Sequence, residues 1–261
     1  MEKAIFFDVD GTLLDCLNGI TDITPRVKKS IKALQDKGHY VFIASGRPYA
    51  FIGKELLEFG FDGFVLTNGA HVVFRDKSIY KRSINKDFIK KMIYNFEKFD
   101  IQYILQGEVY SYIKEDCKEL YSYYDSFGIS RKHLESKYNI DDIDVYKIEM
   151  LCKNKEAIDY CASLENQEYD CNLSNNVFEF YSKKNTKASG ILKVLEKLNI
   201  PIENSYAFGD DTNDIEMLET VGCGIAMGNA SEKIKSHAKK VTDTVQNDGI
   251  AVGIERFIGL H

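Results

Sequence analysis

Short apolar runs alternate with amphipathic segments in the first third of the chain. The apolar runs are typical of buried strands and span residues 4–7, 40–44 and 64–66. Thr24-Pro25 is a helix-start signal, because the hydroxyl caps the first turn and proline suits the first helical position. A second helix is predicted to begin at Pro48, between the second and third runs. This order of strands and helices predicts a parallel sheet covered by helices.

The pattern changes near Lys81, after a predicted hairpin turn at Asn68-Gly69. Strands now follow one another in pairs, with helices between the pairs. Helices are expected at 87–99, 116–127 and 155–164. Strands are expected at 101–105, 109–113, 145–152, 170–173 and 177–181, the last two joined at Asn175-Asn176. Strands paired in this way predict an α+β module built on an antiparallel sheet.

The alternation of single strands and helices resumes at Lys187 and continues through the rest of the chain. Helices are expected at 187–198, 215–218 and 250–258, and strands at 206–208 and 224–226. The predicted fold class is therefore α/β, a Rossmann-like parallel sheet with helices on both faces, plus an inserted α+β domain. Residues 1–82 and 183–261 are expected to form the α/β core, and residues 83–182 the insert.

The composition of the chain narrows its class and its partners. At 261 residues it exceeds the usual single-domain size, and 44% hydrophobic with 28% charged residues is ordinary for a globular protein. The net charge of −6 argues against nucleic-acid and anionic-membrane partners, because no strongly basic face is implied. No run approaches the roughly 18 apolar residues of a membrane span. Six cysteines without a C-x-x-C pair favour free thiols, and with no targeting segment evident a cytoplasmic setting is expected.

Three strands of the predicted parallel sheet end in polar turns. The turns are Asp8-Val-Asp-Gly-Thr12, Ser45-Gly-Arg47 and Gly209-Asp-Asp-Thr-Asn-Asp214. Because ligands of open α/β sheets bind beyond the carboxyl ends of the strands, four carboxylates are expected to converge, namely Asp8, Asp10, Asp210 and Asp214. At an effective dielectric near 20, two unit charges about 4 Å apart repel by roughly 4 kcal/mol, which a bound cation offsets. Oxygen ligands with no nearby histidine or cysteine favour a hard ion, Mg²⁺.

Each of these signals also has a simpler structural explanation. Asp210 and Asp211 suit the cap of the following helix, and Asp214, one turn in, fits the same explanation. Lys187 lies in the predicted first turn of a helix, where the helix dipole disfavours a cation. A bound phosphate reverses that preference, since lysine and helix N-terminus then attract the same anion, but a solvated lysine is the alternative. Ser45 before a glycine is unremarkable in isolation, so the placement at strand ends carries the weight.

Four stretches of the chain together resemble the motifs of one enzyme superfamily. They are Phe-Asp-Val-Asp-Gly-Thr at 7–12, Ala-Ser-Gly-Arg at 44–47, the lysine at 187 before a helix, and Gly-Asp-Asp-Thr-Asn-Asp-Ile-Glu-Met-Leu at 209–218. In this order, with a long insert between the second and the third, they resemble the haloacid dehalogenase-like superfamily, and within it the Cof-type phosphatases of subclass IIB. The likeness covers essentially the whole chain. It implies that residues 83–182 form a cap domain that closes over the substrate.

The resemblance implies a role for each matching residue. Asp8 would be the nucleophile that takes the phosphoryl group, and Asp10 would protonate the leaving oxygen and then deprotonate the hydrolytic water. The implied ligands of Mg²⁺ are the Asp8 carboxylate, the Asp10 backbone carbonyl and Asp210. Ser45 and Lys187 would bind phosphoryl oxygens in the transition state, and Asp214 would orient Lys187 or metal-bound water. The further phosphate- or substrate-binding residues implied are Thr12, Gly46, Arg47 and Asn213.

The implied function is Mg²⁺-dependent hydrolysis of a small phosphorylated metabolite, such as a sugar phosphate or a phosphorylated cofactor, through an aspartyl phosphate. Asp10 separates this prediction from the dehalogenases of the superfamily, which lack the second carboxylate. A phosphotransferase or phosphomutase using the same aspartyl phosphate is the alternative, and a phospho-accepting signalling module is a third. Candidates to face the substrate from the insert strands are Tyr110, Tyr112, Glu179 and Tyr181. The sequence indicates neither the substrate nor an oligomeric partner.

Overall fold

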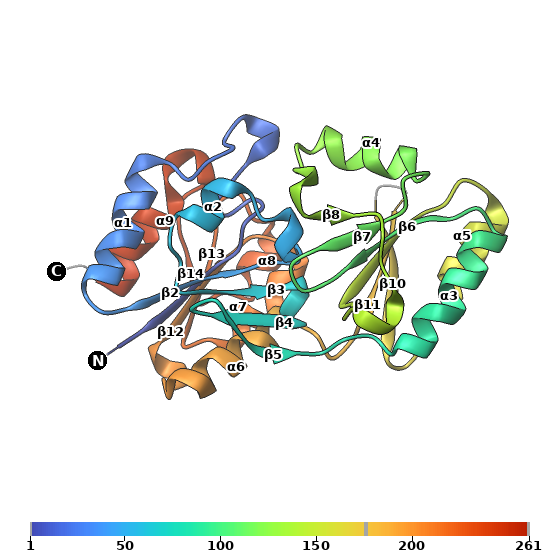
Figure 1. The fold of residues 1–261 in the computed structure, drawn as a ribbon. Coiled ribbons are helices and arrows are strands. Elements are labelled where there is room, and N and C mark those ends of the chain that lie inside the picture. The colour runs from blue at the N-terminus through green and yellow to red at the C-terminus, as the bar shows by residue number, and fades with distance from the viewer. Residues whose placement is uncertain (1, 175–176, 260–261) are drawn as a thin grey trace. The chain divides into compact units, whose positions relative to one another are not determined.

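One sheet joins strands from both ends of the chain (Figure 1). The structure is a computed structural model in which residues 2–174 and 177–259 are described, and among these residues the sheet has eight strands. They are β1 (Ala4–Phe7), β2 (Tyr40–Ala44), β3 (Gly63–Leu66), β4 (His71–Phe74), β5 (Lys77–Lys81), β12 (Ser205–Gly209), β13 (Cys223–Ala226) and β14 (Lys240–Val241). Their order is β14-β13-β12-β1-β2-β3-β4-β5. Neighbours from β14 to β3 are parallel, and β4 and β5 extend the sheet in antiparallel pairing.

β1 lies in the middle of this sheet, as its four apolar and fully buried residues require. Its side chains alternate between the two faces, so Phe6 stacks on Phe42 of β2, with ring centroids 5.2 Å apart. Phe7 points the other way and stacks on Phe208 of β12, with centroids 5.3 Å apart. The chain extends the sheet to one side through β2 and β3, and to the other side through β12 and β13. The reversal between β1 and β12 is the switch point at which sheets of this kind bind ligands.

Helices cover both faces of the sheet. They are α1 (Pro25–Asp36), α6 (Lys187–Leu198), α7 (Ile215–Thr220), α8 (Glu232–Lys235) and α9 (Gly249–Gly253), which a π-helical turn (Ile254–Ile258) extends. α6 and α7 pack against the face that carries Phe6, and α9 packs with α1 on the opposite face, where Phe208 lies. The hydroxyl of Thr24 caps α1 by accepting the N–H of Val27 at 3.4 Å, as the start signal predicts. This arrangement confirms the predicted α/β class.

The inserted part of the chain forms a second sheet, of six strands among the described residues (Figure 1). Its strands are β6 (Gln102–Gln106), β7 (Ser111–Ile113), β8 (Leu134–Glu135), β9 (Lys147–Leu151), β10 (Tyr169–Ser174) and β11 (Val177–Ser182). Their order is β10-β11-β9-β6-β7-β8, antiparallel throughout except for the parallel pair β7 and β8. The helices of the insert are α3 (Lys86–Lys98), α4 (Lys118–Ser126) and α5 (Lys155–Ala162). α3 and α5 cover the face that carries Leu105, whereas α4 packs against Ile104 on the other face.

Contacts within the chain divide the protein into two units. The first comprises Met1–Gly46, Lys54–Lys81 and Thr186–His261, and the second comprises Arg47–Gly53 and Arg82–Asn185. The first unit contains the eight-stranded sheet and the second contains the six-stranded sheet. The joints at 81/82 and 185/186 lie close to the boundaries that the sequence suggests, after residues 82 and 182. The short segment 47–53, which the sequence places in the core, groups with the second unit.

The segment after β2 differs from its prediction. In place of one helix from Pro48, the structure has a 3-10 turn (Tyr49–Phe51) and then α2 (Lys54–Glu58). The two are separated at Ile52, whose backbone is extended at φ −75° and ψ 122°. Phe51 packs on Tyr124 of the second unit, with ring centroids 4.9 Å apart, whereas α2 belongs to the first unit. The prediction of one continuous helix from Pro48 is wrong, because the two halves of the segment pack into different units.

The sequence pattern does not predict three of the strands, namely β5, β8 and β14. Each lies at the edge of its sheet, where a strand pairs on one side only and needs no apolar run. The strands β10 and β11 pair as expected, but the predicted turn at Asn175-Asn176 lies outside the described residues. Among the described residues, no helix combines the length and the apolar character that crossing a membrane requires.

Candidate active site

The carboxyl ends of β1 and β12 bring three carboxylates together. Asp8 directly follows β1, and its backbone N–H donates to the carbonyl of Phe208 in β12 at 3.0 Å. Carboxylate oxygens of Asp8, Asp210 and Asp214 all lie within 4.8 Å of one another. Asp8 and Asp214 are buried, and Asp210 is half-buried. The structure thus joins three of the four carboxylates that the sequence places at strand ends, at the switch point of the sheet.

The ammonium group of Lys187 lies between two of these carboxylates. Its Nζ atom is 2.6 Å from Oδ1 of Asp8 and 2.6 Å from Oδ1 of Asp214. Lys187 is the first residue of α6, which Thr186 caps, and its side chain is only 1% exposed. Burial alone lowers the pKa of Lys187, but the attraction of Asp214 and Asp8 outweighs it and raises that pKa above its ordinary value. The alternative of a solvated lysine is therefore wrong, and the lysine stays charged.

Asp214 uses both of its carboxylate oxygens within the protein. Oδ1 accepts from Lys187, and Oδ2 accepts the backbone N–H groups of Asp210 at 2.9 Å and Asp211 at 3.0 Å. Asp211 accepts the N–H of Thr212 at 2.6 Å, and Asp211 and Asp214 form a capping box at the start of the helical turn. The capping explanation is thus correct for Asp211 and Asp214, and Asp214 additionally fixes the position of the lysine.

The third carboxylate, Asp210, lies against the turn that follows β1. Its Oδ1 accepts the hydroxyl of Thr12 at 2.8 Å, and Thr12 is buried. Gly11 turns the backbone at φ +81°, and a Cβ atom there would lie 2.1 Å from Oδ2 of Asp210. Glycine is required at this position by the backbone conformation and also by the closeness of the carboxylate. The hydroxyl of Thr12 thus points to Asp210.

The electrostatics of the cluster favour a bound cation. Burial and the neighbouring Asp214 raise the pKa of Asp8 well above its ordinary range, and Lys187 offsets only part of this effect. Burial, together with Asp214 and Asp211, likewise raises the pKa of Asp210 to about 7 against the opposing hydrogen bond from Thr12. A cation beside Asp8 and Asp210 would relieve both shifts. Because the donors are carboxylate oxygens, the group that fits them is a hard divalent ion such as Mg²⁺.

A polar set lies at the ends of β2 and β3 in the same unit. Ser45 directly follows β2 and is 1% exposed, and its carbonyl accepts the N–H of Asn68 at 3.1 Å. A Cβ atom on Gly46 would lie 3.1 Å from Oδ1 of Asn68 and 3.4 Å from Nδ2 of Asn213. Asn213 donates to that same Oδ1 at 3.3 Å. The structure therefore brings together Ser45, Gly46 and Asn213, and adds Asn68, which the sequence marks only as part of a hairpin turn.

Two predicted residues have other surroundings. The side chain of Arg47 donates to the carbonyl of Phe51 at 3.0 Å, and both residues group with the second unit. Asp10 is exposed, and its backbone forms an isolated β-bridge with Leu14 in the turn after β1. Asp10 thus lies two residues beyond Asp8, on a solvent-accessible part of this turn.

Comparison with known proteins identifies the family of this arrangement. The family model described as haloacid dehalogenase-like hydrolase matches residues 5–254, which include every strand-end turn described above. The chain belongs to the haloacid dehalogenase-like hydrolase family. The resemblance drawn from the four motifs is thereby confirmed.

Relatives of this haloacid dehalogenase-like chain are phosphatases by name. YkrA of Bacillus subtilis is 33% identical over 267 residues, covering 98% of this chain and 97% of that protein. The 5-amino-6-(5-phospho-D-ribitylamino)uracil phosphatase YcsE of the same organism is 30% identical, with coverage of 98% and 96%. The solved structure of the subclass IIB sugar phosphatase BT4131 superposes with a TM-score of 0.80 at 28% identity, covering 99% of this chain and 100% of that chain. These likenesses confirm the Cof-type class and the phosphatase prediction.

Sequence reasoning missed one residue at the acidic cluster of this haloacid dehalogenase-like protein. The side chain of Asn229 donates to the carbonyl of Gly11 at 2.9 Å and lies 3.5 Å from Oδ2 of Asp210. Asn229 occurs in the turn after β13, in a stretch whose sequence signal is an N-x-S triplet. Neither that triplet nor its distance along the chain from Gly11 indicates the contact, which only the fold provides.

The second unit contains a buried polar cluster on the sheet face opposite α3 and α5. Lys147 pairs with Glu149 at 2.9 Å and with Glu179 at 3.0 Å. Glu149 also accepts from Gln106 at 2.7 Å and from the hydroxyl of Tyr124 at 2.5 Å. Burial disfavours the charge on Glu149, but Lys147 and these hydrogen bonds outweigh it and lower the pKa of Glu149. Charged residues at alternate positions of an otherwise apolar strand, β9, are the sequence signal for this cluster.

The four candidate residues on the insert strands have separate partners within the second unit. Glu179, which is half-buried, pairs with the buried Lys147, and the hydroxyl of Tyr181 accepts from Asn172 at 3.2 Å. Tyr112 packs with the apolar cluster beneath α3 and α5, on the opposite face of the sheet. Tyr110 contacts the ring of His133, with centroids 5.7 Å apart. The structure therefore divides the four between the two faces and an end of the sheet, and does not gather them into one set.

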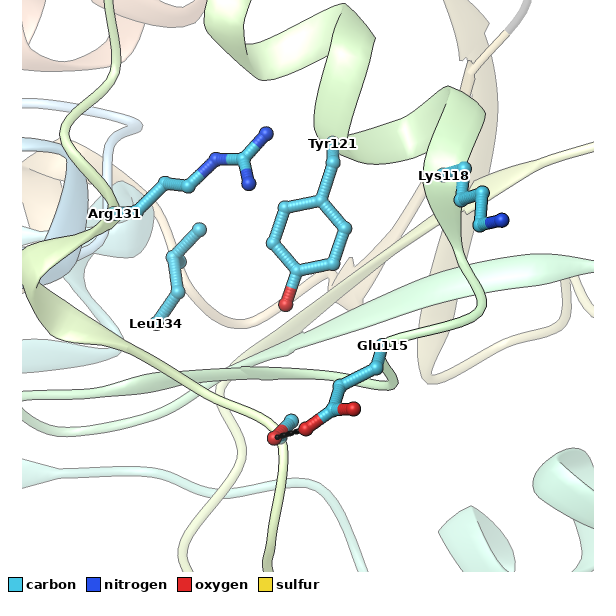
Figure 2. A pocket seen from close by; sticks show the side chains of 6 residues that line it. Glu115, Lys118, Tyr121, Arg131 and Leu134 are labelled. Carbon is cyan, nitrogen blue, oxygen red and sulfur yellow. Dashed lines mark hydrogen bonds between the residues drawn. The ribbon is translucent and has the colours of Figure 1, made fainter.

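A cavity of about 460 Å³ opens within the second unit (Figure 2). Its lining residues are Glu115, Lys118, Tyr121, Arg131, Leu134 and Ser136. The guanidinium of Arg131 lies 4.6 Å from the ring centroid of Tyr121, and its Nε donates to Asp125 at 3.0 Å. Glu115 accepts from the hydroxyl of Ser136 at 3.0 Å. Arg131 and Glu115 thus already have partners in the protein, and the acidic cluster contributes no residue to this cavity.

Proposed function

We propose that this haloacid dehalogenase-like phosphatase hydrolyses a small phosphorylated metabolite with Mg²⁺, through a phosphoryl group carried on Asp8. The observation that carries the proposal is the position of Lys187, held at 2.6 Å by Asp8 and at 2.6 Å by Asp214. A buried ammonium beside a buried carboxylate at a strand end provides an acceptor for a phosphoryl group and a positive charge for its oxygens.

The first half of the reaction transfers the phosphoryl group to the protein. An oxygen of the Asp8 carboxylate forms a bond to phosphorus while the bond from phosphorus to the leaving oxygen breaks. Asp10, two residues further along the same turn, gives its proton to the leaving oxygen, and the alcohol departs. The exposure of Asp10 is compatible with this role, since the water that later returns its proton must reach it from the solvent.

The second half returns Asp8 to its starting state. Asp10, now a carboxylate, accepts a proton from a water molecule whose oxygen attacks the phosphorus. The bond from phosphorus to Asp8 breaks, inorganic phosphate leaves, and the proton remains on Asp10 for the next turnover. One carboxylate therefore serves as the nucleophile and the other as acid and base, which matches the buried position of Asp8 and the exposed position of Asp10.

Two sets of side chains are assigned to the phosphoryl oxygens. Lys187 supplies the charge and Ser45, buried at the end of β2, supplies a hydroxyl. Ser45 forms the second set together with Asn213 and the backbone at Gly46. The side chain of Asn68 lies against both Asn213 and Gly46. As negative charge spreads over the phosphoryl oxygens in the transition state, such fixed donors stabilise it more than the ground state.

Mg²⁺ is assigned to Asp8, to Asp210 and to the backbone carbonyl of Asp10. The raised pKa values of Asp8 and Asp210 support a cation at this position, because burial and, after it, the neighbouring carboxylates disfavour their charge, which a cation would offset. When bound, Mg²⁺ neutralises charge between the nucleophile and the phosphoryl group. Thr12 then acts on the metal side of the site, since its hydroxyl holds Asp210 in place.

The substrate class proposed is a phosphate ester of a small polyhydroxylated molecule, either a sugar phosphate or a phosphorylated cofactor precursor. The names of two kinds of relative support it, a sugar phosphatase and a phosphatase of a ribitylamino compound. We assign recognition of the leaving group to the second unit.

Phosphate release from an aryl phosphate, measured with Mg²⁺ and with chelator, tests the mechanism. We expect activity with Mg²⁺, its loss on chelation, and its loss in Asp8→Asn. Equal rates with and without chelator, or an active Asp8→Asn variant, would contradict the proposal. A panel of phosphorylated metabolites then identifies the substrate. Repeating the assay with an acceptor sugar distinguishes hydrolysis, which releases phosphate, from transfer to the sugar hydroxyl.

A further inference from the structure

One side chain after β13 reaches the turns that follow two other strands. Nδ2 of Asn229 donates to the carbonyl of Gly11 at 2.9 Å, in the turn after β1, and lies 3.5 Å from Oδ2 of Asp210, in the turn after β12. Its Oδ1 accepts the backbone N–H of Val245 at 3.2 Å. A single amide therefore links both metal-side turns to the segment that follows β14.

The carboxylate of Asp210 has a neutral donor on each oxygen. The hydroxyl of Thr12 donates to Oδ1 at 2.8 Å, and the amide of Asn229 approaches Oδ2. Neutral donors fix the direction of a carboxylate while leaving its charge available, whereas a lysine in the same place would cancel that charge. Outer partners of this kind orient the carboxylates that bind metal ions.

The same amide also fixes the backbone next to Asp10. Gly11 holds a left-handed conformation at φ +81°, and its carbonyl is the group that accepts from Asn229. The carbonyl of Asp10 belongs to the preceding peptide, so its direction depends on the conformation held at Gly11. Gly11 in turn lies directly against the carboxylate of Asp210, so a shift in one displaces the other.

We propose that Asn229 is a positioning residue for the divalent cation, holding the Asp210 carboxylate and the Asp10 carbonyl in one fixed relation. The inference rests on the proposed function, which assigns Mg²⁺ to these groups. Asn229 touches neither the phosphoryl group nor the nucleophile in this assignment, and it acts through Asp210 and Gly11. Its loss affects the binding of Mg²⁺ before it affects the binding of substrate.

Calorimetric titration of Mg²⁺ into substrate-free protein tests the inference on wild type, Asn229→Ala and a matched control, Asn247→Ala. Asn247 lies in the segment after β14, and its amide donates to a carboxylate, that of Asp243, at 2.9 Å. We expect Asn229→Ala to weaken Mg²⁺ binding by about 10- to 100-fold, the usual range for a lost outer partner, and Asn247→Ala to bind as wild type does. At saturating Mg²⁺ the KM for substrate is expected to stay unchanged.

Thermal unfolding in chelator separates positioning from a general loss of structure. We expect Asn229→Ala to unfold near the temperature of the control in chelator, and to gain less stability than the control when Mg²⁺ is added. Should Asn229→Ala fail to fold, Asn229→Gln, which keeps the amide but displaces it by one methylene, carries the same expectation. A folded variant that binds Mg²⁺ within twofold of wild type overturns the inference alone. A wild type that binds no Mg²⁺ and releases no phosphate overturns the proposed function as well.

Discussion

Nζ of Lys187 lies 2.6 Å from Oδ1 of Asp214, and neither side chain is more than 1% exposed. The second oxygen of Asp214 accepts two backbone N–H groups from the turn after β12. Asp214 therefore ties the first residue of α6 to the end of a central strand. These contacts of Asp214 fix the position of the Lys187 ammonium, which lies 2.6 Å from Asp8. The distance between the nucleophile and the phosphate-binding charge therefore depends on Asp214, although Asp214 touches neither substrate nor metal in the proposed mechanism.

Removing the charge of Asp214 is expected to damage both stability and catalysis. Asp214→Asn leaves the shape but presents an amide to the ammonium of Lys187, which loses one of its two partners. We expect the free energy of unfolding to fall by about 3 kcal/mol, the lower end for a broken buried pair, because Asp8 still pairs with the lysine. We expect kcat to fall about 100-fold through misplacement of the ammonium. Urea unfolding and steady-state kinetics measure the two effects.

The matched control for this change is Glu196→Gln, which removes an exposed pair on the same helix. Lys193 and Glu196 are 2.9 Å apart, with side chains 43% and 73% exposed, so solvent screens their interaction. The control is expected to retain the stability and kcat of wild type. A kcat for Asp214→Asn within threefold of the control would show that the position of Lys187 does not depend on Asp214.

Two glycines with nearly the same backbone conformation allow the cost of backbone strain to be measured separately from a steric clash with Asp210. Gly11 has φ +81° and Gly19 has φ +83°, but a Cβ atom meets Asp210 only at Gly11, whereas Gly19 has no atom within 4 Å. We expect Gly19→Ala to cost about 1 kcal/mol of stability and leave activity unchanged, since it adds only backbone strain. Gly11→Ala is expected to lose Mg²⁺ binding and activity. Chemical denaturation, Mg²⁺ titration and phosphate release compare the pair, and equal effects would exclude the collision.

The sequence predicts the central fold well because the relevant signals are local. Buried parallel strands need apolar runs, so β1 and β2 are found at residues 4–7 and 40–44 with their bounds unchanged. A capping threonine before a proline begins α1 where it is expected. The edge strands are missed because pairing on one side requires no such run. The break at Ile52 is missed because it arises from packing between distant parts of the chain.

The residues of the candidate site also fall into two groups, those that local sequence signals predict and those that only the fold brings together. Asp8, Asp210 and Asp214 are found from sequence because strand ends are predictable and the sheet brings them together. Burial of Lys187 is not predictable, since the local sequence that begins a helix does not say whether its first turn is solvated or enclosed. The contact of Asn229 with Gly11 joins residues far apart in sequence through a side chain that has no motif of its own. Contacts of this kind follow from the order of the strands and not from any local pattern.

The affinity for Mg²⁺ is expected to depend on pH through Asp210. The pKa of this group is raised from 3.8 to about 7, first by burial and further by Asp214 and Asp211. A raised pKa means that the folded, metal-free protein holds a proton more tightly than the unfolded chain, so its stability falls as pH rises from about 4 to 7. Because Mg²⁺ binds the ionised carboxylate, its affinity rises over the same range. Calorimetric titrations between pH 5 and 8 measure this, and an affinity independent of pH would contradict it.

The stability of the second unit is expected to depend on Lys147. Lys147→Met removes the cation that pairs with Glu149 at 2.9 Å and leaves that buried carboxylate without a charged partner. We expect a loss of about 3–5 kcal/mol at neutral pH, the cost of breaking a buried pair. In wild type the pKa of Glu149 is lowered, so its contribution is present above its ordinary value of 4.5 and is lost as pH falls through the lowered one. In Lys147→Met the loss of stability should instead become smaller as acid neutralises Glu149.

Lys90→Met, which breaks an exposed pair with Asp141, is the control and should unfold as wild type does. Urea unfolding at pH 5 and pH 7 measures both variants, and a deficit that stays constant with pH would show that Glu149 is not the source of the loss.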